Sequence, residues 1–392
     1  MKIVQYRQCP CAATAPILRP LTETLLTVEP TIDFDKGHPM NIAETNTPEH
    51  DSAATLRARQ KQFSEVPTLV APGRPMLEYL PVALFGSVMG LTGLSIAWQL
   101  AHEHFGLPAG IALTIGALAL LVFVLMSAGY GVKIVTAFGA VRSEFRHPIA
   151  GNMFGTVPIS LLLLPMVLEP FAHRLAQALW ITGGVGMIFL AWLIVSRWMS
   201  DRQQVAHATP AWIIPVVGLL DVPLALPVLG LPTMHGLMVF ALAVGLFFAV
   251  PLFTLIFSRL LFEPPLPDTL KPSLMILVAP FAVGYSSYSV TSGQSDLLAE
   301  ALYMLTLFLL AVLIRQLRNL PICCPFRVSW WAVSFPLAAS SIAALRFAAA
   351  QPDLITNAIA IALLTLATVV IVLLLGRTVL GLVKGELRTL SG

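Results

Sequence analysis

Asp221 is the residue whose type and position most clearly suggest chemistry. It is the only acid or base well inside any of the long apolar stretches of the chain. An ionisable group in such a stretch is costly to bury and is usually there for a function. Two interpretations stay open: Asp221 takes up and releases a proton, or its carboxylate caps a half-helix that starts at Val222 and Pro223.

The residue types that build enzyme and metal sites do not occur at useful spacings. His102 and His104 flank Glu103 and are two residues apart, whereas a helical zinc site needs two histidines one helical turn apart. Cys9 and Cys11 have no second Cys/His pair at metal spacing. We therefore expect no catalytic residue, no metal, no cofactor and no nucleic-acid partner.

Composition indicates the kind of scaffold that holds Asp221. Of the 392 residues, 57% are hydrophobic and 11% are charged, about half the charged fraction of an average soluble domain. The apolar residues form ten runs, each of about 20 residues, the length that crosses a bilayer. Because lipid offers the backbone no hydrogen bonds, these runs must be helices. We expect an all-α integral membrane protein with spans at 80–100, 109–130, 151–168, 175–197, 211–231, 236–258, 272–291, 297–316, 328–347 and 355–376.

Prolines interrupt the odd-numbered spans, and among the even-numbered ones only the sixth contains a proline, Pro251. A proline within a helix removes a backbone donor and bends the helix. Prolines are also common in membrane helices without further meaning, but the alternation favours five helical hairpins whose bent, odd-numbered inner helices surround a central pore. The residues that we expect to kink these helices or line the pore are Phe85, Pro158, Pro215, Pro223, Pro280, Phe281 and Pro336.

Basic residues predict the orientation. Thirteen lysines and arginines lie in alternate linkers or after the last span, and only Arg174 and Arg346 lie on the opposite side. By the positive-inside rule, both termini are cytoplasmic and the protein lies in the cytoplasmic membrane. We expect three parts: a disordered cytoplasmic tail over 1–76, without a signal peptide and with Met40 as an alternative start, a transmembrane domain over 77–380, and a short cytoplasmic tail over 381–392.

Five stretches of the chain resemble one membrane protein family. They are FGSVMGLTGLSIAW from Phe85, His147-Pro148 followed by NMFGTVPISLLLL, the stretch Pro210–Gly218, the stretch Leu270–Leu274, and WWAVSFPLAA from Trp330. These stretches are similar to the tellurite-resistance/dicarboxylate transporter family, which includes the bacterial tellurite resistance protein TehA and the plant guard-cell slow-type anion channels. The resemblance covers roughly residues 78–380.

The resemblance implies a homotrimer in which each ten-helix protomer has its own pore. It also implies that a phenylalanine on the ninth helix plugs this pore, and by motif match that residue is Phe335. Phe154 is a second, weaker candidate for an occluding ring.

We expect Arg146 and Lys271 at the inner mouth and Arg346 at the outer mouth to concentrate anions, although topology and lipid headgroup contact would also explain them. A path without fixed cations suits conduction, since tight binding would slow release. Two functions therefore stay open: a channel for small anions gated by Phe335, or a proton-coupled carrier of C4-dicarboxylates or oxyanions such as tellurite and sulfite that uses Asp221.

Overall fold

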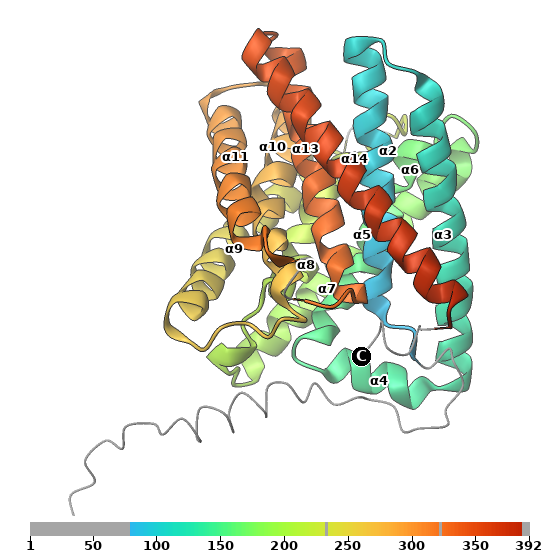
Figure 1. The fold of residues 1–392 in the computed structure, drawn as a ribbon, viewed down its shortest axis with the longest axis vertical. Helices are drawn as coiled ribbons and strands as arrows, with labels where there is room; N and C mark the ends of the chain where they lie inside the picture. The colour runs from blue at the N-terminus through green and yellow to red at the C-terminus, as the bar shows by residue number, and fades with distance from the viewer. Residues whose placement is uncertain (1–78, 232–233, 321–323, 386–392) are drawn as a thin grey trace, which may run out of the picture. The chain divides into compact units, whose positions relative to one another are not determined.

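The computed structural model describes residues 79–231, 234–320 and 324–385, and within these ranges all regular secondary structure is helical (Figure 1). This confirms the all-α class. The predicted tail over 1–76 lies outside the described residues, as do Cys9 and Cys11. The last helix, α14 (Leu354–Val383), runs seven residues beyond the predicted end of the tenth span at 376 and past the expected domain boundary at 380.

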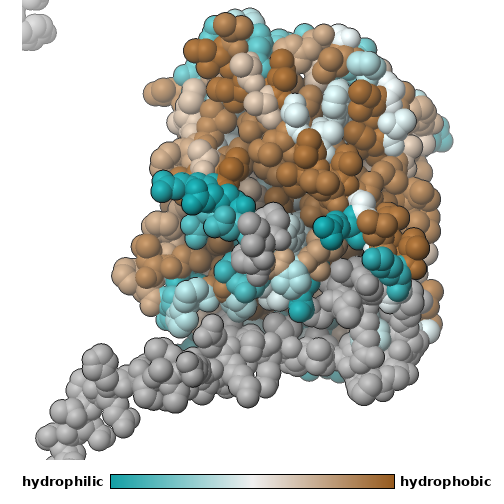
Figure 2. Space-filling model, in the orientation of Figure 1, coloured by the Kyte–Doolittle hydropathy of each residue, from teal (hydrophilic) through white to brown (hydrophobic). Residues whose placement is uncertain are grey.

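Five long helices have the pattern of lipid-facing elements. Between 17% and 39% of the most apolar stretch of each is buried. Their exposed side chains are large and apolar, as with Leu125, Phe189 and Phe247, and Figure 2 shows hydrophobic residues over much of the visible surface. Because exposed apolar area on this scale is not stable in water, the protein is a multi-pass membrane protein. The five are α3 (Ala109–Thr136), α7 (His173–Ser200), α9 (His235–Phe262), α11 (Leu297–Leu317) and α14.

The elements that precede each of these helices in the chain are buried, and each begins as a 3-10 helix. In four of them, 67–83% of the most apolar stretch is buried. We call the five elements the inner segments. They are η2 (Val82–Leu84) with α2 (Phe85–Phe105), η3 (Ala150–Gly155) with α5 (Thr156–Leu163) and α6 (Pro165–Leu168), η5 (Pro210–Ile213) with α8 (Ile214–Val217) and η6 (Gly218–Asp221), η7 (Lys271–Val278) with α10 (Ala279–Ser292), and η8 (Val328–Val333) with α13 (Ser334–Ala350).

The prolines lie where the helix type changes. Pro158, Pro215, Pro280 and Pro336 all fall in the first turn of an α-helical part that follows a 3-10 part. A proline has no N–H to donate, and the first turn of an α-helix is the place where none is needed. The expected sharp kinks within spans are therefore changes from 3-10 to α geometry.

The inner segments form a closed ring. Their 3-10 parts contact one another in the order η2, η3, η5, η7, η8 and back to η2, so all five segments begin at the same end of the bundle. Further along, α2 contacts α5 and α13, and α13 contacts α10. Each inner segment also contacts the long helix that follows it. In Figure 1, for example, α14 crosses in front of α13 and α2, and it contacts both. The expected separation into inner and outer elements is thus present.

The described residues contain nine helices that are long and apolar enough to cross a membrane, together with the shorter apolar helix Pro210–Asp221. This shorter helix is the predicted fifth span, and turns continue it as far as Gly230. The arrangement as ten full membrane-crossing helices therefore stays a prediction.

A buried ion pair joins the start of the first inner segment to its neighbours. The Lys133 ammonium of α3 lies 2.7 Å from Glu144 of the short helix α4 (Phe138–Arg146), and both side chains are buried. Glu144 also accepts hydrogen bonds from the Val82 N–H and the Tyr130 hydroxyl, and Lys133 donates to the Leu80 carbonyl. The predicted second span ends at residue 130, which placed Lys133 in a linker, whereas α3 extends to Thr136 and includes it.

Candidate functional site

A cavity of about 620 Å³ lies inside the ring of inner segments. Every inner segment contributes to its wall, and within the described chain none of the long outer helices does. Most of the wall is apolar. The segments contribute Ala83, Gly86 and Met89; Ala150, Met153, Thr156 and Ile159; Ile213, Ile214, Val217, Gly218 and Asp221; Ser273, Ile276, Ala279 and Val283; and Val328, Ser329, Trp331, Ala332, Phe335 and Pro336.

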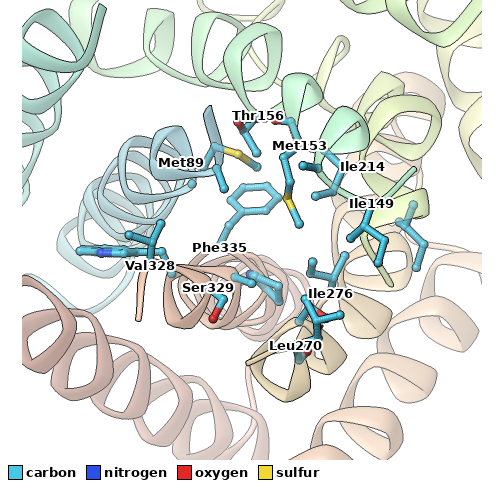
Figure 3. Close-up of a pocket in the computed structure, with 18 of the residues that line it drawn as sticks. Met89, Ile149, Met153, Thr156, Ile214, Leu270, Ile276, Val328, Ser329 and Phe335 are labelled. Atoms are coloured by element: carbon cyan, nitrogen blue, oxygen red, sulfur yellow. Dashed lines mark hydrogen bonds between the residues drawn. The ribbon is translucent and has the colours of Figure 1, made fainter. Parts of the chain in front are cut away.

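The Phe335 ring lies at this cavity and forms part of its wall, and its role as a plug stays a prediction. Phe335 is the second residue of α13, and Figure 3 shows its ring within the circle of inner segments, with the sulfur atoms of Met89 and Met153 turned towards it. A second cavity of about 20 Å³ is also lined by Phe335 and Val283. The ring therefore lies between a wide space on one side and a narrow one on the other.

Glycines on α2 allow α13 to approach closely enough to place this ring. A Cβ added at Gly90 would overlap the Ser334 side chain, and one added at Gly93 would lie 2.9 Å from the Cβ of Ala338 and 3.6 Å from the Phe335 ring. The Ser334 hydroxyl also donates to the Trp331 carbonyl at 2.6 Å, which fixes the turn before Phe335. Small residues thus set the position of the ring through helix packing.

Asp221 lies in the wall of the large cavity. It is 1% exposed, and its Oδ1 atom has no hydrogen-bond partner. The interpretation as a cap for a helix starting at Val222 is wrong, because residues 222–230 form turns and no described helix begins there. Asp221 ends the 3-10 helix η6 instead. It is also not the only buried ionisable residue, since Lys133, Glu144 and Arg259 are buried as well.

Polar residues surround the end of the cavity where the inner segments begin. His147, Asp268 and Arg327 contribute to its wall there. Lys271 lies 2.6 Å from Asp268 Oδ1, so its charge is offset by an acid that lines the cavity. Arg146 is exposed and is not part of the wall; its carbonyl accepts from Arg197. The sequence predicted that Arg146 and Lys271 concentrate anions at this mouth, but it did not indicate Arg327, which lines the cavity.

His147 holds the turn that leads into the second inner segment. Its Nδ1 accepts hydrogen bonds from the N–H groups of Ile149 at 3.2 Å and Ala150 at 3.1 Å. Burial, and secondarily the nearby His207, lowers the pKa of His147. The imidazole is therefore held neutral, with a proton on Nε2 and a lone pair on Nδ1.

Three phenylalanines expected at the pore pack elsewhere. Phe85 contacts Phe123 and Tyr130 of α3, with ring centroids 6.2 Å away in each case. Phe154 packs edge-on against Phe145 at 5.0 Å and against Tyr130 at 6.3 Å. Phe281 packs against Phe253 of α9 at 5.7 Å. These rings join inner segments to the elements around them, and none of the three lines the large or the small cavity. Their place at the pore stays a prediction.

Most of the selected prolines are also absent from the wall of the cavity. The carbonyl of Pro158 lies 3.0 Å from a Cβ placed at Gly183 of α7, and the Cα of Pro215 lies 3.3 Å from one placed at Gly155. Pro280 and Pro223 are absent from the wall as well, and Pro336 alone among the selected prolines contributes to it. The selected prolines mark where helix geometry changes, and only one of them marks the surface of the cavity.

Arg346 lies at the opposite end of the inner segments from Arg327. It belongs to the last turns of α13 and lines the small cavity together with Phe335 and Ser286. Its Nε atom is buried without a hydrogen-bond partner. Of the three basic residues selected from the sequence, Arg346 alone lines either cavity.

Comparison with known proteins gives the family. Residues 79–379 match the family described as SLAC1, voltage-dependent anion channel. The chain is 28% identical over 314 residues to the S-type anion channel SLAH2 of Arabidopsis thaliana, covering 78% of this chain and 60% of that protein. It is 26% identical over 317 residues to the guard cell S-type anion channel SLAC1 of the same plant, covering 78% of this chain and 56% of that protein.

A bacterial relative is matched over more of its length. The tellurite resistance protein TehA homolog of Haemophilus influenzae is 26% identical over 322 residues, which cover 78% of this chain and 92% of that protein. The chain spans 60% or less of the two plant relatives. The resemblance seen in the five motifs is confirmed, and because the matched region contains all five inner segments, the chain belongs to the SLAC1 family of voltage-dependent anion channels.

Proposed function

We propose that this protein is an anion channel of the cytoplasmic membrane that conducts small anions through the space enclosed by its own inner segments, with Phe335 as the gate. The observation that carries this proposal is the position of the Phe335 ring between the large and the small cavity. An aromatic ring at a narrow point excludes water, and an ion cannot pass a dry constriction. The names of the plant relatives, which are anion channels, support the same class.

The electrostatic potential at the mouth of the cavity, where the inner segments begin, favours anions. All five inner segments begin at one end, so the positive ends of their helix dipoles gather around the mouth of the cavity. Arg327 adds a positive charge to the wall there, and Asp268 is offset by Lys271. A potential made of dipoles and few fixed charges attracts an anion without holding it tightly.

Gating requires that the ring move aside. Met89 and Met153 line the cavity around Phe335 and are flexible, polarizable side chains that tolerate a change of rotamer next to them. The opening movement is therefore a rotation of the Phe335 side chain about the start of α13. No rearrangement of the whole ring of helices is needed.

The test is Phe335→Ala, with chloride conductance measured in planar bilayers containing purified protein. We expect a rise of about tenfold or more, which corresponds to a barrier lower by about 1.4 kcal/mol. Phe281→Ala is the matched control, because Phe281 is also 8% exposed and also lies in the first turn of an inner α-helix, but it packs against α9. Equal conductance of Phe335→Ala and the parent, in protein that elutes as a folded species, would refute the gate.

A second candidate function is a proton-coupled carrier of dicarboxylates or oxyanions. The observation that favours it is the unpartnered Oδ1 of Asp221 in the cavity wall. A carrier of this kind would transport malate or tellurite only with a proton gradient, and Asp221→Asn would stop transport. If Asp221→Asn keeps the anion conductance of the parent without any gradient, the channel is the better description.

We further propose that both termini face the cytoplasm and that the protein forms a homotrimer with one pore per protomer. The first rests on the distribution of basic residues and the second on the resemblance to the family. Reporter fusions at each terminus test the orientation. Native mass spectrometry of the purified protein tests the assembly, and a monomer would refute it.

A further inference from the structure

The small cavity beyond Phe335 contains two polar groups that lack partners. Ser286 of α10 is 2% exposed, and its hydroxyl oxygen has no hydrogen-bond partner. The Arg346 Nε of α13 is also buried and without a partner. Both residues line the cavity of about 20 Å³, whose remaining wall is almost entirely apolar. Two unsatisfied donors on residues that line one small cavity are costly unless an acceptor binds there.

Arg346 differs from the buried cation at the other end of the bundle. The Lys133 ammonium is paired with Glu144 at 2.7 Å. The ionisable groups that act on Arg346 are Tyr285 and, more weakly, Glu103. Glu103 is exposed and accepts a hydrogen bond from Gln99, so solvent screens its charge. The guanidinium therefore leaves a net positive potential in the small cavity.

The size of the cavity limits what can bind there. A space of about 20 Å³ accommodates roughly one water-sized particle, since about 10–15 Å³ is needed for one water. A halide fits this limit, and a C4-dicarboxylate does not. The apolar wall formed by Ile96, Leu163, Met166 and Leu224 also offers nothing to a second carboxylate.

We propose that this small cavity is an anion-binding subsite for one small monovalent anion, with the Arg346 guanidinium and the Ser286 hydroxyl as its donors. The proposal rests on the anion channel function and names the class of ion that the path takes next to the gate. An anion that passes Phe335 enters this subsite, where one charge-assisted hydrogen bond binds it. Its affinity is lower than that of a site with several cations, so the anion can be released.

The test measures binding and conduction separately. Chloride binding to the purified parent protein is followed by broadening of the chloride-35 NMR signal, which does not require the gate to open. Conductance is recorded in the Phe335→Ala background as a function of chloride concentration. The variants are Arg346→Gln, Arg346→Lys and Ser286→Ala. The control is Arg174→Gln, which removes an exposed positive charge at the first turn of α7.

We expect Arg346→Gln to raise the half-saturating chloride concentration about tenfold in both measurements, the size expected for one charge-assisted hydrogen bond. Ser286→Ala should have a smaller effect in the same direction, Arg346→Lys should retain most of the binding, and Arg174→Gln should leave it unchanged. Malate should not compete with chloride at equal concentration.

Failure of this proposal is distinct from failure of the gate. If Phe335→Ala raises conductance but Arg346→Gln and Ser286→Ala leave chloride binding unchanged, the subsite is refuted and the gate stands. If Arg346→Gln abolishes chloride binding while Phe335→Ala leaves conductance unchanged, the gate is refuted and the subsite stands. Displacement of bound chloride by malate at equal concentration would refute the limit on size.

Discussion

Glu144→Ala should destabilise the protein more than any other single substitution near the mouth of the large cavity. The carboxylate accepts hydrogen bonds from the Val82 N–H at 2.8 Å, the Tyr130 hydroxyl at 3.0 Å and the Lys133 ammonium at 2.7 Å. Its removal leaves Lys133, whose side chain is 4% exposed, as a buried charge without its partner. Breaking one side of a buried ion pair costs about 3–5 kcal/mol.

The assay is thermal unfolding of detergent-purified protein, followed by a thiol-reactive dye that reports on buried Cys324. The double variant Lys133→Met with Glu144→Leu removes both charges, so we expect it to lose about 1–3 kcal/mol less than the sum of the two single variants. Glu169→Gln is the matched control. Its carboxylate lies 3.2 Å from His173 Nδ1 on a half-exposed surface, where such a contact contributes about 0–1 kcal/mol.

Two outcomes would refute this reasoning. If Glu144→Ala melts within a degree of the parent, the carboxylate does not hold the start of the first inner segment. If the double variant loses the full sum of the single effects, then Lys133 and Glu144 act independently and their 2.7 Å contact carries no coupling energy.

Three other predictions concern residues that hold the inner segments and the helices around them in place. Gly90→Ala forces a methyl group into Ser334, so we expect unfolding to be easier by about 1–3 kcal/mol in a thermal melt. Asp353→Ala removes the capping box of α14, and a loss of about 0.5–2 kcal/mol should appear in the same assay. Burial, and secondarily His207, lowers the pKa of His147, so the unfolded chain binds the proton more readily. Stability should therefore be full above about pH 6.5 and decline in acid, and His147→Gln should flatten this decline in melts recorded from pH 7.5 to 5; an unchanged slope would contradict it.

The division into inner and outer elements could be predicted because the two kinds of helix differ in how many prolines they contain. A helix exposed to lipid must satisfy its backbone donors and acceptors by itself, so it tolerates few prolines. A helix buried among others can place prolines where 3-10 geometry changes to α. This physical difference appears in the sequence as an alternation between spans with and without prolines. The buried fractions of the helices alternate in the same way.

The wall of the cavity could not be predicted in the same way. Phe85, Phe154 and Phe281 resemble Phe335 in local sequence, since each lies near a glycine or proline of an inner segment. The direction in which each ring points depends on where its segment passes from 3-10 to α geometry, because the two helices advance by different angles per residue. Only the motif match distinguished Phe335 from the others. The apolar residues that surround it, such as Met89 and Ile214, carry no signal of their own.

The 3-10 starts also explain why a ring of packed helices encloses a space. A 3-10 helix is tighter than an α-helix and rises about 2.0 Å per residue instead of about 1.5 Å. The eight residues of η7 therefore span about 16 Å with a thinner backbone, where an α-helix would span about 12 Å. Five thin elements in a closed ring leave room at their centre, and all five 3-10 starts contribute residues to the wall of the large cavity. In the last segment the backbone then changes to α geometry. Phe335 lies in the first turn after that change in the last segment. The 3-10 starts thus account for the large cavity, and Phe335, the proposed gate, lies where the geometry of the backbone changes.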